Sequence, residues 1–168
     1  MNIWTHLVAF VAFMGWFGVI FGDDFARVSS RGDRAMLTIL VASAEMCFCA
    51  STAYHALHCV SERWHMRLYK LDIGGICVLI YGSFVAGLYS GFYCRPLWQW
   101  LYLSLLSVMI ALTLLLTLVD KYLAPRYAAV RTGVLVCTVA FGVVPAVHWA
   151  ATAARADAAA VGLRVVAM

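Results

Sequence analysis

Five apolar stretches, each about as long as a membrane is thick, dominate this 168-residue sequence. A helix needs about 20 mostly apolar residues to cross the hydrocarbon core of a bilayer. Hydrophobic residues make up 65% of the chain and charged residues only 12%, with a mean hydropathy of +0.90. Too little polar surface remains to cover a water-soluble fold. The sequence therefore predicts an all-α, integral membrane helical bundle with transmembrane helices at about residues 3–21, 36–58, 71–93, 97–119 and 130–152.

The connections between these stretches are short and polar, so consecutive helices should be antiparallel neighbours. The first stretch lacks a basic leader and a small-residue cleavage site, and we expect it to be kept as a helix. Pro145 lies inside the last stretch and should kink it, because proline has no N–H to donate. After residue 153 the pattern ends in an Ala-rich segment, residues 154–168, which is too short and too charged to span a membrane.

Orientation in the membrane follows from the Lys and Arg residues beside the spans, since cytoplasmic loops carry the excess. The side of the N-terminus would hold Arg63, Arg67, Lys70, Lys121, Arg126 and Arg131, and the other side Arg27, Arg31, Arg34, Arg95 and Arg155. This small difference favours a cytoplasmic N-terminus. The net charge of +4 forms no basic stripe, which argues against nucleic acid as a partner and leaves the lipid bilayer as the expected one.

A small polar cluster is the feature that most suggests chemistry, because ionisable groups inside membrane spans are costly. Ser51 and His55 are four residues apart, so they share one face of the second expected helix. Asp72 lies at the expected start of the third helix, and the hairpin turn should place it at a similar depth to His55. A histidine, a carboxylate and a hydroxyl together could bind a metal and orient a water. The alternatives are a hydrogen-bonded packing histidine and an aspartate that caps its helix.

Other ionisable residues extend or flank this cluster. His58 follows His55 by three residues, a spacing that can chelate a metal on a helix. His6 should lie at the same membrane face as His55, whereas His148 should lie about 30 Å away at the other face, because each helical residue rises about 1.5 Å. Glu45 lies deeper in the second span, where it is either a buried, protonated acid or the partner of a polar group on another helix.

Two segments, Asn2-Ile3-Trp4-Thr5-His6 and Ser51-Thr52-Ala53-Tyr54-His55, are similar to motifs of one known membrane-protein family. The first resembles the start of the membrane core, and the second the SxxxH element, of the adiponectin receptor and haemolysin III-related family, also called the progestin and adipoQ receptor family. Leu71-Asp72-Ile73-Gly74-Gly75-Ile76 resembles its LDYxGI segment, with Ile73 in place of the tyrosine. Later matches include Pro125-Arg126-Tyr127 and Gly142-Val143-Val144-Pro145 with His148, so the resemblance covers about residues 2–150.

The resemblance implies a seven-helix bundle with a cytoplasmic N-terminus and a zinc site at the inner leaflet. In the family, zinc is held by the SxxxH histidine and by two histidines of an HxxxH motif on the seventh helix. By this resemblance His55 is a zinc ligand, Asp72 contacts the zinc-bound water and Ser51 is a nearby polar group. No HxxxH occurs in this sequence. We therefore expect residues 1–153 to form part of the family fold, truncated after the fifth helix, with an incomplete zinc site.

Three functions remain open at this point. The first is a signalling receptor of the adiponectin or progestin type, with a lipid or sphingolipid, a peptide or a steroid-like compound as its ligand. The second is a zinc-dependent, ceramidase-like lipid amidase, in which Asp72 would act as general base and Ser51 would lie near the developing oxyanion. His58 or His6 would then have to replace the missing zinc ligands. The third is a non-catalytic fragment that acts only through association with other membrane helices.

Overall fold

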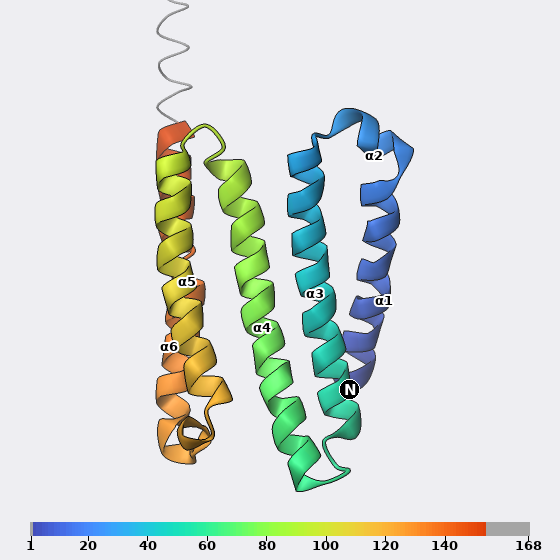
Figure 1. Cartoon of the computed structure of the whole chain (residues 1–168), viewed down its shortest axis with the longest axis vertical. Coiled ribbons are helices and arrows are strands. Elements are labelled where there is room, and N and C mark those ends of the chain that lie inside the picture. The colour runs from blue at the N-terminus through green and yellow to red at the C-terminus, as the bar shows by residue number, and fades with distance from the viewer. Residues whose placement is uncertain (1, 154–168) are drawn as a thin grey trace, which may run out of the picture.

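The computed structural model describes residues 2–153, and every regular element among them is helical. Five helices are long and apolar enough to cross a membrane, as predicted. Figure 1 shows α1 beside α3, α3 beside α4 and α5 beside α4, with α6 overlapping α5 in the view. Residues 154–168, the expected Ala-rich tail, lie outside the described residues. The elements are α1 (Asn2–Phe21), α2 (Asp23–Val28), α3 (Arg31–Leu57), α4 (Glu62–Gly91), α5 (Pro96–Leu118), two short 3₁₀ turns, η1 (Asp120–Leu123) and η2 (Pro125–Tyr127), and α6 (Ala128–Ala140).

Helices α3 and α4 begin earlier than the apolar pattern predicts, and capping explains both starts. At the first, Ser30 Oγ accepts a hydrogen bond from the backbone N–H of Asp33 at 3.1 Å, and the Asp33 carboxylate accepts one from the Ser30 N–H at 3.0 Å. This capping box satisfies two donors that a helix start leaves free. Before α4, Ser61 Oγ accepts from the Trp64 N–H at 3.3 Å. Both helices therefore extend from the apolar region into polar sequence.

The fifth span is broken one turn before Pro145, which confirms the predicted kink. Helix α6 ends at Ala140, residues 141 and 142 form a turn, and residues 143–153 are helical again. Pro145 has no N–H to donate to the Phe141 carbonyl, and that carbonyl accepts from Val144 instead, at 3.0 Å. The whole segment Pro125–Ala153 still has the length and hydropathy of one span.

Glycines bring α3 and α4 into close contact. A Cβ built on Gly75 would lie 3.0 Å from Cys47 Cα, and one on Gly82 would overlap the Ser43 hydroxyl and lie 2.7 Å from Ser43 Cβ. Neither position leaves room for a larger side chain without a shift of the helices. Small residues that let two backbones approach are typical of membrane helix pairs, because the hydrophobic effect does not drive helices together within lipid and close packing must do so.

The remaining contacts are apolar inside the bundle and on its outer surface. Cys77, Leu106 and Ile110 form one buried cluster between α4 and α5, and Leu88, Phe92 and Tyr102 form a second. Many large apolar side chains face outward; on α1 they include Trp4, Val8 and Val11. Such a surface is expected where lipid rather than water surrounds the helices.

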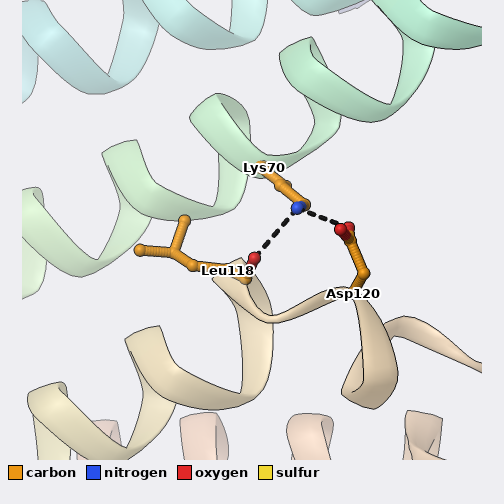
Figure 2. A network of polar contacts seen from close by, with 3 residues as sticks. All are labelled: Lys70, Leu118 and Asp120. Carbon is orange, nitrogen blue, oxygen red and sulfur yellow. Dashed lines mark hydrogen bonds and ion pairs between the residues drawn. The ribbon is translucent and has the colours of Figure 1, made fainter.

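Lys70, in the third turn of α4, connects that helix to the end of α5 (Figure 2). Its ammonium group donates to the Leu118 carbonyl at 2.9 Å and pairs with the Asp120 carboxylate at 2.6 Å. The carbonyl belongs to the last residue of α5, where helical carbonyls lack partners and a cation is favourable. The side chain thereby joins α4 to the end of α5, at the same end of the bundle as the α3–α4 connection (Figure 1).

Candidate functional site

Three polar side chains meet between α1 and α3 at the end of the bundle that carries the N-terminus. His6 Nδ1 lies 2.6 Å from Ser51 Oγ, and the rings of His6 and His55 have their centroids 5.7 Å apart in an edge-on arrangement. Ser51 is buried, with 5% of its surface exposed, while His6 and His55 are half-buried. The structure thus brings Ser51 and His55 together, with His6 as their partner from the other helix.

Helix geometry and packing hold these groups in place. Ser51 and His55 are one turn apart on α3 and both contact α1 through His6. One turn deeper, Phe48 packs against His6 at 6.1 Å and against Phe13 of α1 at 5.6 Å between ring centroids. The aromatic pair borders the polar cluster on its membrane side. An apolar border of this kind strengthens the hydrogen bond, because the local dielectric is low.

Asp72 lies near this cluster in depth but on the α4 side of α3. It is half-buried and stands between Tyr69 and Gly75, which both contact α3, Tyr69 through Tyr54 at 6.0 Å. Among the described residues no hydrogen bond or ion pair joins Asp72 to Ser51 or His55. Because α4 begins at Glu62, Asp72 lies well inside the helix and not at its start. The alternative of a capping aspartate is therefore wrong.

The rings of His58 and His148 do not join the His6–Ser51–His55 cluster. His58 Nδ1 donates to the carbonyls of Tyr54 at 3.1 Å and His55 at 3.2 Å, and its Nε2 lies 3.5 Å from Cys59 Sγ. The His58 ring therefore bonds to carbonyls at the end of its own helix and is not paired with the His55 ring as a metal chelate. His148 Nδ1 is hydrogen-bonded to the Tyr102 hydroxyl at 2.8 Å, in the part of the bundle formed by α5 and the last span. This agrees with the expected separation of His148 from His55.

Residues 2–153 do not by themselves complete a zinc site. The cluster offers two imidazoles and one hydroxyl, and within residues 2–153 no group of three or more His, Cys, Asp or Glu side chains is placed to hold a metal ion. Catalytic zinc is typically held by three protein ligands and structural zinc by four. The arrangement of these residues supports a hydrogen bond between α1 and α3.

The hydrogen bond between His6 and Ser51 should stabilise the α1–α3 pair. We expect Ser51→Ala and His6→Leu each to lower the free energy of unfolding, and the double variant to lower it by less than their sum. Interhelical hydrogen bonds in membranes couple by about 0.5–1.5 kcal/mol. Unfolding in mixed detergent–SDS micelles measures all four proteins. Strict additivity of the two substitutions would show that this bond contributes nothing.

Comparison with known proteins assigns the chain to a family. The family model for haemolysin-III related proteins matches residues 1–168. The chain belongs to this family. It is 34% identical to the adiponectin receptor protein of Drosophila melanogaster over 88% of this chain and 33% of that protein. It is 31% identical to human progestin and adipoQ receptor family member 3 over 89% of this chain and 49% of that protein.

Heptahelical transmembrane protein 1 of Arabidopsis thaliana is a third similar protein, 29% identical over 88% of this chain and 46% of its own length. The chain thus spans between a third and a half of the length of these three relatives. Family membership and the five apolar helices together make the protein an integral, multi-pass membrane protein. The expected position of His6 at the level of His55 is confirmed by the contact of their rings, whereas the hydrogen bond of His6 to Ser51 was not predicted from the sequence.

Proposed function

We propose that the chain acts as a membrane receptor of the adiponectin and progestin type, with its N-terminus in the cytoplasm. Family membership supports this, because the Drosophila relative is named an adiponectin receptor and the human one a progestin and adipoQ receptor. The observation that carries the proposal is the cluster of His6, Ser51 and His55 between two apolar helices. Ionisable groups are costly inside a membrane, and a cluster of them there is a reason to propose a functional site. Its ligand is a lipid or sphingolipid, a steroid-like compound or a peptide.

The same cluster is proposed as part of an inner-leaflet zinc site. His55 would be a zinc ligand and His6 a second one through its Nε2 atom, because Nδ1 of His6 is engaged with Ser51. Asp72, at a similar depth on α4, would remain the polar group that orients a water. The remaining ligands would come from outside the described residues. Zinc polarises bound water and carbonyl groups, but two imidazoles do not support a hydrolytic step by these residues alone.

Zinc retention tests the role of His55. The full chain in phosphatidylcholine nanodiscs is equilibrated with zinc, dialysed and analysed for metal by mass spectrometry. We expect His55→Ala to retain several-fold less zinc than the unmodified chain, since it loses one of two imidazoles. His148→Ala is the matched control, because His148 is also half-buried and is bonded to Tyr102. Equal zinc content in the unmodified and His55→Ala chains would remove the metal proposal.

Receptor activity has a separate test. Membranes that contain the full chain are assayed for saturable binding of labelled progesterone and labelled adiponectin, with membranes lacking the chain as reference. We expect saturable binding of at least one of these two ligands. Absence of both, from a chain shown to be inserted by protease protection, would contradict the receptor type proposed. The same protease assay determines whether the N-terminus is cytoplasmic, because the α3–α4 connection must then be cytoplasmic too.

A further inference from the structure

The connection between α5 and the fifth span presents two cations on a pair of tyrosine rings. The rings of Tyr122 and Tyr127 contact each other edge to face, with centroids 5.4 Å apart. Lys121 Nζ lies 5.8 Å from the Tyr122 centroid, and Arg126 Cζ lies 4.9 Å from the Tyr127 centroid. Cations at these distances are attracted by the ring faces. The two positive groups are thus held on neighbouring rings.

The side chain of Arg131 holds the backbone of this connection in place. Arg131 donates from Nη1 to the carbonyl of Tyr122 at 2.6 Å and to that of Ala124 at 3.4 Å. Pro125 begins the second 3₁₀ turn, and its ring restricts the backbone there. The hydrogen bonds and the proline together reduce the entropy that the connection would lose on binding a ligand.

Among the described residues, neither cation forms an ion pair. Lys121 and Arg126 are exposed, and within residues 2–153 the single ion pair is the one between Lys70 and Asp120. Asp120, the acid nearest to Lys121 in the sequence, is thus already paired with Lys70 (Figure 2). Arg63 and Arg67, exposed in the first turns of α4, add positive charge at the same end of the bundle. Glu62 and the paired Asp120 are the acids beside these cations, whereas Asp23, Asp24 and Asp33 accompany the arginines at the opposite end.

The depth of this connection matches lipid headgroups. It directly follows the apolar helix α5, and its tyrosines are half-buried, as expected for rings at a membrane–water interface. Exposed lysine and arginine side chains beside such rings reach the level of the phosphates. A guanidinium matches a phosphate with two parallel N–H donors, and the ammonium adds a second charge.

We propose that the connection formed by Lys121, Tyr122, Arg126 and Tyr127 is a binding surface for the headgroup of an anionic phospholipid. The phosphate is held by Lys121 and Arg126 together, with the tyrosine rings behind them. Charge complementarity selects an anionic over a zwitterionic lipid, because the choline group of the latter repels the same cations. The surface is separate from the His6–Ser51–His55 cluster and does not depend on the receptor proposal or on zinc.

Native mass spectrometry of the full chain in detergent, titrated with phosphatidylglycerol or phosphatidylcholine, tests the surface. We expect the first phosphatidylglycerol to bind about 5-fold or more tighter than phosphatidylcholine, since each cation near the surface contributes about 1 kcal/mol. Lys121→Gln/Arg126→Gln should abolish most of this preference. The matched control, Arg27→Gln/Arg95→Gln, removes the same charge from exposed positions at the other end and should leave it unchanged.

The unmodified chain provides a measurement that does not depend on how a variant folds. The preference for phosphatidylglycerol should fall several-fold as ionic strength rises from about 0.05 to about 0.5 M, because added salt screens exposed charges. A preference that survives in Lys121→Gln/Arg126→Gln, or that the control pair lowers equally, would overturn the assignment to this connection. Equal binding of the two lipids by the unmodified chain would overturn the surface itself.

Discussion

Replacing Gly82 with leucine should destabilise the protein by about 3 kcal/mol, because the side chain would force α3 and α4 apart. A Cβ at this position already overlaps the Ser43 hydroxyl and lies 2.7 Å from Ser43 Cβ, with the Ile39 carbonyl at 3.3 Å. Two of these three atoms cannot rotate away, since one belongs to the backbone and one is a Cβ. Unfolding in mixed detergent–SDS micelles measures the change.

Gly74 provides the control on the same helix. A Cβ there meets no atom within 4 Å, so Gly74→Leu adds a side chain that lipid can accommodate. We expect its free energy of unfolding to stay within about 1 kcal/mol of the unmodified chain, with a small gain from the better helix propensity of leucine. If Gly82→Leu were as stable as Gly74→Leu, close approach at Gly82 could not be what holds α3 against α4.

The sequence predicted where the transmembrane helices lie, but it predicted less well where α3 and α4 begin. The difference has a physical reason. Hydropathy reports the thickness of the membrane, so it located the five spans and, with Pro145, the kink in the last one. It does not report where backbone hydrogen bonding begins. Ser30 with Asp33, and Ser61 with Trp64, start α3 and α4 in polar sequence. These capping signals were visible in the sequence, but hydropathy alone gives them no weight.

The candidate site was predictable where it depends on one helix and less so where it depends on two. The spacing of Ser51 and His55 placed both on one face, since helical periodicity is local. The hydrogen bond from His6 depends on the rotation of α1 about its axis, which is determined by packing against Phe48 and its neighbours. The zinc and water roles of His55 and Asp72 remain predictions, drawn from the resemblance of their motifs to the family.

Replacing Glu45 with leucine should raise the free energy of unfolding by about 1–3 kcal/mol, the cost of a buried polar group without a partner. Glu45 is only 7% exposed, and neither carboxylate oxygen has a hydrogen-bond partner among the described residues. Two turns further along α3, Thr52 Oγ1 is also unpartnered, whereas Thr113 and Thr117 on α5 each donate to the carbonyl four residues earlier. Glu45 and Thr52 thus place buried polar atoms on α3 that have no hydrogen-bond partner among the described residues.

Two further variants separate charge from polarity. Glu45→Gln should give a smaller gain than Glu45→Leu, because its amide is uncharged but still lacks partners. Glu62→Leu, at an exposed position in the first turn of α4, is the control and should change stability by less than about 0.5 kcal/mol. A loss of stability in Glu45→Leu would show that the carboxyl has a bonded partner, such as an ordered water. A gain would mean that this acid is kept for a purpose other than folding, since intramembrane acids are costly.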